Sequence, residues 1–376
     1  MQLRHMIAAL LSAASLLLQG CAPLVIRDAK APVPTDAPYA IRTLGADGRF
    51  STLSAQSVAQ RLHALRVDEP PNILALSGGG ADGAFGAGAL VGLTRSGLRP
   101  QFSVVTGVSA GALIAPYAFL GPDWDEQLVD IYTTGRAEHL LQSRGVGALF
   151  GSSIYQGTPL KELVDRYATD TLIQAVAHEA ATGRLLLVAT TDVGTGEPVV
   201  WDLGSIAMHG GAGARVLFRD VLVASASVPG MFPPVVIRVQ EQEALYDEVH
   251  VDGTITAPFI IPLPLSRGAA VYVIVDGRLS EEPQPIRLRT RAIVSRSVST
   301  GLNHLLRTTL ELTATNAELQ GARFQYAAIP VTYPTQAPFD FRAATVRSLF
   351  RYAYECAQSG QLWASYDDSK GRLVSR

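Results

Sequence analysis

A serine flanked by two glycines is the side chain best suited to covalent chemistry in this sequence. It is Ser109 in Gly107-Val108-Ser109-Ala110-Gly111, which follows a predicted buried strand at residues 102–106 and precedes a predicted helix at 110–119. A sharp strand-to-helix turn needs small neighbours, here Gly107 and Gly111, and exposes the serine hydroxyl at the helix N-terminus. This context predicts that Ser109 is a nucleophile.

A serine hydroxyl is a poor nucleophile and needs a base within hydrogen-bond reach. Asp252 ends an alternating run of apolar residues and is followed by Gly253. An aspartate has a pKa of about 4 in water, but exclusion of water raises it and makes the carboxylate a better base. The sequence allows two alternatives: a triad of Ser109, Asp252 or Asp276, and His304, or an Asp252 that only closes a turn.

A second glycine motif precedes the serine. Gly78-Gly79-Gly80-Ala81-Asp82-Gly83 lies between a predicted strand at 72–77 and a predicted helix at 83–96. It satisfies the dinucleotide pattern G-x-G-x-x-G, but no Asp or Glu lies between Asp82 and Asp123, where that site needs a carboxylate, so a nucleotide is disfavoured. Glycines also let backbone N–H groups approach a developing negative charge. The loop therefore predicts an oxyanion hole at Gly78, Gly79 and Gly80, with a simple tight turn as the alternative.

Two successive strand-loop-helix units position these motifs, and each motif occupies the loop of one unit. Consecutive units of this kind favour a parallel sheet covered by helices, which is an α/β fold. Apolar patterns predict further strands at 184–190, 198–203, 235–239, 248–252 and 270–275, and helices at 158–167, 290–317 and 346–361.

Two segments allow two interpretations each. Residues 121–157 contain Gly135, Gly145, Gly147 and Gly151, so they form either a movable lid or an ordinary surface excursion. Near the start of the long predicted helix, basic side chains either face anionic lipid or form a solvated helix face; they are Arg287, Arg289, Arg291 and Arg296.

The N-terminus has the features of an export signal. A basic start is followed by an apolar run at residues 6–18, which is short for a membrane span. Leu18-Gln19-Gly20-Cys21 resembles the lipobox of bacterial lipoproteins, which implies lipidation of Cys21; a plain secretory signal is the alternative. We therefore expect a signal peptide at 1–20, a lipidated cysteine and Pro-rich tether at 21–60, and the folded domain at 61–376.

The composition is that of an ordinary globular protein. The 376 residues are 48% apolar and 17% charged, with a net charge of −2. This balance offers no electrostatic basis for binding nucleic acid. Only two cysteines are present. If Cys21 carries lipid, Cys356 has no partner for a disulfide and is expected to be a small buried residue.

Four blocks together resemble the patatin-like phospholipases. They are the glycine loop at 78–83, the serine motif at 107–111, the segment 224–234 and Asp252-Gly253. The resemblance covers residues 72–276. It implies a three-layer α/β/α sandwich with a mainly parallel sheet, a Ser109–Asp252 dyad in place of a triad, and an oxyanion hole from the glycine loop. It also implies acyl-ester substrates, usually phospholipids or lysophospholipids, without a metal or other cofactor.

The chain departs from the family pattern at two positions. Asp82 stands where the family commonly has a basic residue, and Thr254 stands where a second glycine is commoner. We expect a lipid-anchored serine acyl hydrolase, or a transacylase with the same residues. The alternative of another class is a catalytically silent lipoprotein that binds lipid or an envelope protein. Ala22 after the lipidated cysteine favours the periplasmic side of an outer membrane.

Overall fold

The computed structural model describes residues 41–64, 70–145, 151–241, 244–261, 265–280, 285–286, 288–334, 339–367 and 372–374. The predicted export signal, Cys21 and residues 21–40 of the predicted tether lie outside this part of the chain. Among the described helices, none combines the length and the apolar composition that a membrane span requires.

Ten of the described strands form one sheet, whose main path has the order β10-β9-β3-β4-β5-β6-β1-β2. The strands are β1 (Ile41–Leu44), β2 (Phe50–Leu53), β3 (Asn72–Leu76), β4 (Val104–Val108), β5 (Leu185–Asp192), β6 (Glu197–Asp202), β7 (Val235–Glu241), β8 (Ala244–Asp252), β9 (Ala270–Val275) and β10 (Arg323–Ala328). β10, β9, β3, β4 and β5 run parallel to one another. β6 and β8 both pair antiparallel with β5, and β8 also pairs with β7.

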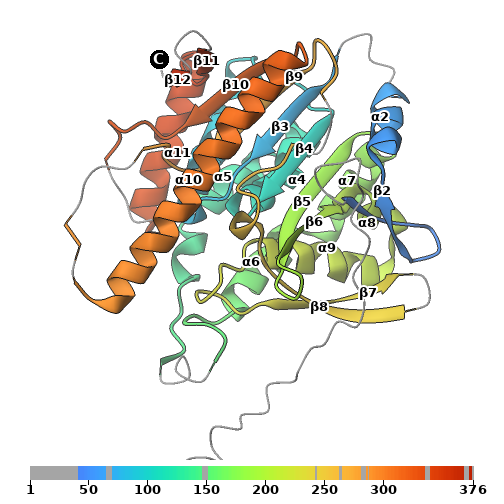
Figure 1. Cartoon of the computed structure of the whole chain (residues 1–376), viewed down its shortest axis with the longest axis horizontal. Helices are drawn as coiled ribbons and strands as arrows, with labels where there is room; N and C mark the ends of the chain where they lie inside the picture. Colours follow the sequence, from blue (N-terminus) through green and yellow to red (C-terminus); the bar gives the residue numbers. More distant parts are fainter. Residues whose placement is uncertain are drawn as a thin grey trace, which may run out of the picture.

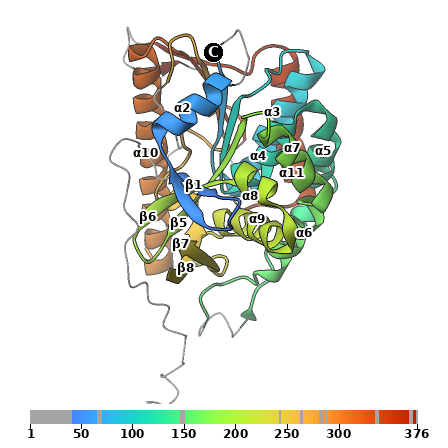
Figure 2. The same ribbon diagram turned by 90° about the vertical axis from the view of Figure 1, so that its right-hand side faces the viewer.

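Helices cover both faces of this sheet. They are α2 (Ala55–Ala64), α3 (Gly83–Arg95), α4 (Ala110–Leu120), α5 (Asp125–Thr133), α6 (Thr158–Tyr167), α7 (Asp170–Ala180), α8 (Leu203–His209), α9 (Gly211–Ser225), α10 (Thr290–Leu319) and α11 (Ala343–Gln358). Figure 2 shows α10 on one side of the sheet and α3, α4, α5 and α11 on the other. The architecture is therefore a three-layer α/β/α sandwich with a mainly parallel central sheet, as predicted (Figure 1).

The central strands are buried on both faces, which explains their continuous apolar sequences. Along β3, Leu74 and Leu76 join the apolar cluster beneath α3, α4 and α11, while Ile73 and Ala75 join the cluster beneath α10. This alternation follows from the two-residue repeat of a strand. Every residue of β4 is buried, so the strand that leads to Ser109 is held from both sides.

The folded domain begins earlier than residue 61. β1 pairs parallel with β6 and antiparallel with β2, so residues 41–53 extend the sheet. Ile41 is buried in the core, and Phe50 packs edge to face against Trp201 of β6. The prediction of a tether reaching residue 60 is wrong, because this short segment is stabilised by partners some 150 residues away in sequence.

Most other predicted elements agree with the structure. α6 spans the predicted 158–167, and α10 extends the predicted 290–317 by two residues. Residues 121–157, for which the sequence allows a lid or a surface excursion, include α5 and a short 3-10 helix (Arg136–His139). Leu128 and Leu140 of this segment are buried, so its first half is part of the core.

Candidate active site

Ser109 lies on a tight turn between β4 and α4. Its backbone has φ 54° and ψ −122°, and it is the one non-glycine residue with positive φ in the described part of the chain. A side chain at Gly111 would place its Cβ 2.5 Å from the carbonyl oxygen of Leu76, and one at Gly107 would lie equally close to the carbonyl of Gly111. Only glycine allows this approach, which explains the small residues on both sides of the serine.

The turn has an anchor that sequence reasoning missed. The backbone N–H of Ser109 donates to Oγ of Ser225 at 3.0 Å, and that hydroxyl donates to the carbonyl of Ala189 at 2.7 Å. Ser225 is fully buried at the end of α9. Its position in the segment 224–234 was the available signal, because the resemblance marks this segment as one of four blocks.

The hydroxyl of Ser109 donates to Oδ2 of Asp252 at 2.5 Å. Asp252 is the last residue of β8, where it pairs with Thr190 of β5, the neighbour of β4. Its other oxygen, Oδ1, accepts the backbone N–H of Thr254 at 2.8 Å. Ser109 and Asp252 are only 5% and 2% exposed, so water has little access to the pair.

Burial raises the pKa of the Asp252 carboxyl to about 6, although the hydrogen bonds from Ser109 and Thr254 act in the opposite direction. At neutral pH most of this group is therefore ionised, and it is more basic than an aspartate in water. A base with a pKa near the working pH is effective in proton transfer. The arrangement is chemically suited to remove the proton of the Ser109 hydroxyl.

The glycine loop lies next to this pair. A side chain at Gly78 would contact Cβ of Ser109 at 3.0 Å, and one at Gly79 would overlap the backbone of Asp276. The N–H of Gly78 donates to the carbonyl of Pro258 at 3.2 Å, so its predicted role as an oxyanion donor is wrong. Within the described residues, no acceptor bonds the N–H of Gly79 or Gly80. These two amides remain the candidate oxyanion donors.

Two carboxyl groups, those of Asp82 and Asp276, lie in or next to the glycine loop. Burial raises the pKa of Asp82 to about 7, opposed by the positive charge of Arg278. Burial, and secondarily the nearby Asp82, raises the pKa of Asp276 well above its usual value. Oδ1 of Asp276 accepts the N–H of Gly86 at 2.8 Å, while Oδ2 is buried without a partner. The raised pKa of Asp276 favours its neutral form, which carries no negative charge next to the glycine loop.

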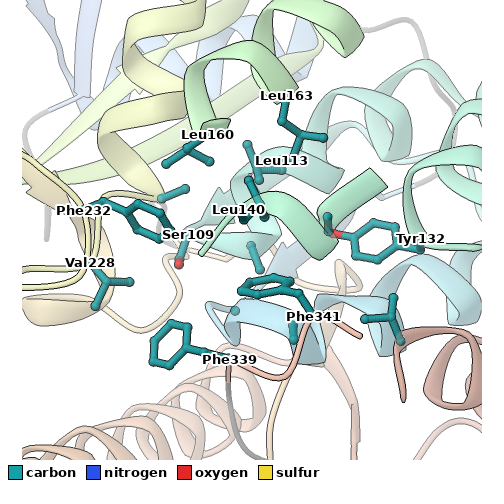
Figure 3. A pocket seen from close by; sticks show the side chains of 16 residues that line it. Ser109, Leu113, Tyr132, Leu140, Leu160, Leu163, Val228, Phe232, Phe339 and Phe341 are labelled. Atoms are coloured by element: carbon teal, nitrogen blue, oxygen red, sulfur yellow. The ribbon is translucent and has the colours of Figure 1, made fainter. Parts of the chain in front are cut away.

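An apolar cavity of about 50 Å³ opens at Ser109. Figure 3 shows aliphatic and aromatic side chains around the serine hydroxyl. They come from α4, α5, α6 and the loops before α6, after α9 and before α11, and they include Leu113, Tyr132, Leu140, Leu160, Leu163, Val228, Phe232, Phe339 and Phe341. Such a lining suits a hydrocarbon chain with a carbonyl group held at Ser109.

The histidine alternatives do not meet Ser109. His304 is exposed on α10, and the Ser109 hydroxyl bonds Asp252 instead. His250 is buried between Thr190, at 3.0 Å, and Glu248, at 3.1 Å. Within the described residues, no group of three His, Cys, Asp or Glu side chains has an arrangement that holds a metal ion.

Fold and site together define an α/β protein in which a buried serine on a strand-to-helix turn donates a hydrogen bond to a buried aspartate beside an apolar cavity. The family described as patatin-like phospholipase matches residues 74–264, and this chain belongs to that family. It is a serine hydrolase that acts on ester bonds, with lipid acyl esters as the substrate class. None of the curated proteins matches the sequence significantly.

Two solved structures resemble the chain. VipD from Legionella pneumophila is 12% identical with a TM-score of 0.38, covering 92% of this chain and 73% of its own. Human GIVD cytosolic phospholipase A2, in complex with methyl gamma-linolenyl fluorophosphonate, is 13% identical with a TM-score of 0.31. That match covers 81% of this chain and 60% of the human one.

Proposed function

We propose that this protein is a membrane-anchored lipid acyl hydrolase that uses Ser109 as nucleophile and Asp252 as base. The observation that carries the proposal is the 2.5 Å hydrogen bond from Ser109 Oγ to Asp252 Oδ2, where Ser109 also lines an apolar cavity. The substrate is an acyl ester of a lipid, of the phospholipid or lysophospholipid type, whose chain occupies the cavity.

The reaction has two halves. Ser109 Oγ attacks the acyl carbonyl while its proton passes to Asp252, and the carbonyl oxygen becomes an anion held by the N–H groups of Gly79 and Gly80. When the carbon–oxygen ester bond breaks, the proton moves from Asp252 to the leaving alkoxide, and an acyl group remains on Ser109. Water then attacks the acyl carbonyl while its proton passes to Asp252. When the bond between the acyl carbon and Ser109 Oγ breaks, this proton moves from Asp252 to Ser109 Oγ, which releases the fatty acid and restores the free serine and the ionised aspartate.

Stabilisation of the oxyanion by preorganised N–H donors contributes a large part of the rate acceleration. Loss of a single preorganised donor elsewhere lowers kcat by about 10²–10³-fold. The start of α4, directly after Ser109, adds the positive end of a helix dipole. Its Ala110 side chain is small and buried, so the substrate oxygen can approach the backbone.

The membrane anchor is the second part of the proposal. Cys21 is the residue that would carry the lipid, after removal of residues 1–20, and Ala22 favours retention at the outer membrane on its periplasmic side. Several acyl chains on one cysteine hold a protein firmly on a bilayer. Radiolabelled palmitate incorporated in cells tests this part, because a Cys21→Ala variant should lose the label.

Labelling by a fluorophosphonate probe tests the chemistry. Purified residues 22–376 are compared with Ser109→Ala, Asp252→Asn and His304→Ala. We expect no labelling of Ser109→Ala, a rate lowered at least about 10³-fold in Asp252→Asn, and an unchanged rate in His304→Ala.

The controls separate activity from folding. Circular dichroism shows whether each variant keeps its secondary structure. If folded wild-type protein is not labelled even with lipid present, the hydrolase proposal is rejected and the silent lipid-binding lipoprotein takes its place. Loss of labelling in His304→Ala would replace the dyad with a triad.

A further inference from the structure

The helix α10 is much longer than the strands that it covers. Its 30 residues span about 45 Å at 1.5 Å per residue, whereas the six residues of β10 span about 20 Å. The buried residues of α10 are confined to its C-terminal half, at Leu306, Leu310, Ala314 and Ala317. Figure 1 shows the other half extending away from the sheet at the lower left.

This projecting segment, residues 288–305, exposes apolar side chains. None of its described side chains is buried. Leu288 is 92% exposed, Val294 55% and Val298 53%, and Ile293 is exposed as well. Val294 and Val298 are four residues apart and therefore lie on one face of the helix. Several exposed apolar side chains on one short projecting segment indicate an interaction site.

The charge of the same region has a single sign. Between Pro285 and Leu310 the sequence contains no Asp or Glu, although the whole chain has a net charge of −2. The projecting segment itself contains three arginines, Arg289, Arg291 and Arg296, and it is flanked by Arg287 and Arg307. Apolar residues combined with arginines on one helix are typical of helices that bind the surface of an anionic membrane.

The projecting segment lies at the active-site end of the sheet. The C-terminus of α10 leads directly into the first residues of β10, which runs parallel to β9, β3 and β4. The N-terminus of α10 therefore lies beyond the carboxyl ends of these strands. Ser109 follows the carboxyl end of β4. A membrane in contact with the projecting segment would face the end of the sheet that carries the nucleophile.

We propose that the projecting segment of α10 is a docking surface for an anionic lipid bilayer. Its valines and Leu288 enter the boundary between head groups and acyl chains, and its arginines contact lipid phosphates. A second copy of this chain is a poorer occupant, because pairing would bring two arginine-rich helices together without any carboxylate between Pro285 and Leu310. Docking does not depend on the lipid at Cys21 or on hydrolysis.

Vesicle co-sedimentation tests the docking surface. The chain without residues 1–21, which keeps every described residue, is mixed with vesicles of phosphatidylcholine alone or with 30% phosphatidylglycerol. We expect stronger binding to the anionic vesicles and a partition coefficient lowered at least about ten-fold in the double variant Val294→Asp, Val298→Asp. The matched control is Leu312→Asp, because Leu312 is 66% exposed on the other half of the same helix and should leave binding unchanged.

Two readouts make the outcome decisive. Hydrolysis of a water-soluble short-chain ester should be the same in both variants and wild type, so a failure of the chemistry is distinguished from a failure of docking. Equal binding of wild type and the double variant, or equal loss in Leu312→Asp, overturns the proposal. A wild-type dimer in light scattering that the double variant converts to monomer, without any change in vesicle binding, overturns it in favour of self-association.

Discussion

Ser109 has a backbone conformation that L-amino acids rarely adopt, with φ 54° and ψ −122°. Such residues cost about 1–3 kcal/mol and are retained where the surrounding structure and the function require them. The hydrogen bond from its N–H to Ser225 and the packing of Gly111 against Leu76 supply that support. This support holds the Ser109 hydroxyl in the position from which it donates to Asp252.

Replacement of this serine should separate strain from chemistry. Both Ser109→Ala and Ser109→Gly remove the nucleophile, but only glycine adopts positive φ without strain. After allowance for the greater freedom of glycine in the unfolded chain, Ser109→Gly should be the more stable variant by about 1 kcal/mol. Urea unfolding of the two proteins checks this. Equal midpoints would mean that the turn is not strained.

The pH profile should report Asp252. Its pKa is raised to about 6 by burial, and the base must be ionised to accept a proton, so kcat/KM should rise as pH increases through about 6 and then level off. Asp82 titrates near 7 in the same region. The pH profile of the Asp82→Asn variant distinguishes the two groups, because the rise of kcat/KM near pH 6 should remain in this variant. If this rise disappears in Asp82→Asn, the rise reports the ionisation of Asp82 and not that of Asp252.

Among the elements, β8 connects Asp252, the proposed base, to β1. Arg42 of β1 donates to Glu248 of β8 at 2.6 Å, and Glu248 contacts His250 at 3.1 Å. Burial alone would raise the pKa of Glu248, but the hydrogen bonds from His250 and Arg42 lower it to about 2. Glu248 is thus charged, and it aligns β8 two strands from the β4 elbow.

Removal of the arginine should be costly. Arg42→Ala leaves the buried Glu248 without its main cation, and loss of one partner from a buried pair destabilises a protein by about 3–5 kcal/mol. The control is Arg238→Ala, which breaks a solvent-exposed ion pair between Arg238 of β7 and Asp247 of β8. Because exposed pairs contribute little to stability, this variant should be much less destabilised than Arg42→Ala. Thermal and urea unfolding measure both. Similar values for the two variants would exclude a structural role of the buried pair.

Replacement by alanine should have opposite effects on stability at two glycines, one in the turn after β4 and one in α10. Ala at position 111 places Cβ against the backbone of Leu76, so Gly111→Ala should cost about 2 kcal/mol or more and disrupt the elbow. Gly301 lies in the middle of α10 with no atom near its Cβ position, and Gly301→Ala should stabilise by about 0.5–1 kcal/mol. Melting temperatures test both predictions: that of Gly111→Ala should fall and that of Gly301→Ala should rise. A lower melting temperature in both variants would contradict the prediction for Gly301.

Among the buried carboxyls, Asp276 should make the stability of the whole molecule decrease as pH rises. The folded pKa of Asp276 lies well above its ordinary value, owing to burial. The native state therefore keeps a proton that the unfolded chain releases above about pH 4. Unfolding releases this proton, so the contribution of Asp276 to stability is most favourable at low pH and falls as pH rises towards its folded pKa, by up to about 1.4 kcal/mol per pH unit.

Asp276→Asn should flatten this dependence. The amide oxygen can still accept the N–H of Gly86, and no ionisation remains at this position. Free energies of unfolding measured between pH 5 and 8 should show a smaller slope in the variant than in the wild type. An unchanged slope would mean that Asp276 does not hold its proton in the native state.

The local units around the site were predictable because their signals are short-range. The strand, glycine loop and helix at 72–96, and the strand, Ser109 and helix at 102–119, each follow from neighbouring residues. The pairing of Ser109 with Asp252 was a hypothesis, since 143 residues separate them. The strand β1 was missed, because its four residues carry no strand signal of their own and form a strand only by pairing with β6.

Residue types and local periodicity were enough to predict which side chains could do chemistry and most of the helices and strands of the central sheet, since both signals come from neighbouring residues. Which backbone amides of the glycine loop are available depends on long-range packing. Pro258, distant in sequence, occupies the N–H of Gly78, whereas Gly79 and Gly80 keep theirs. The structure also decided where α10 leaves the sheet, because burial ends where the strands end. Long-range packing selects among local possibilities, and no local pattern contains that information.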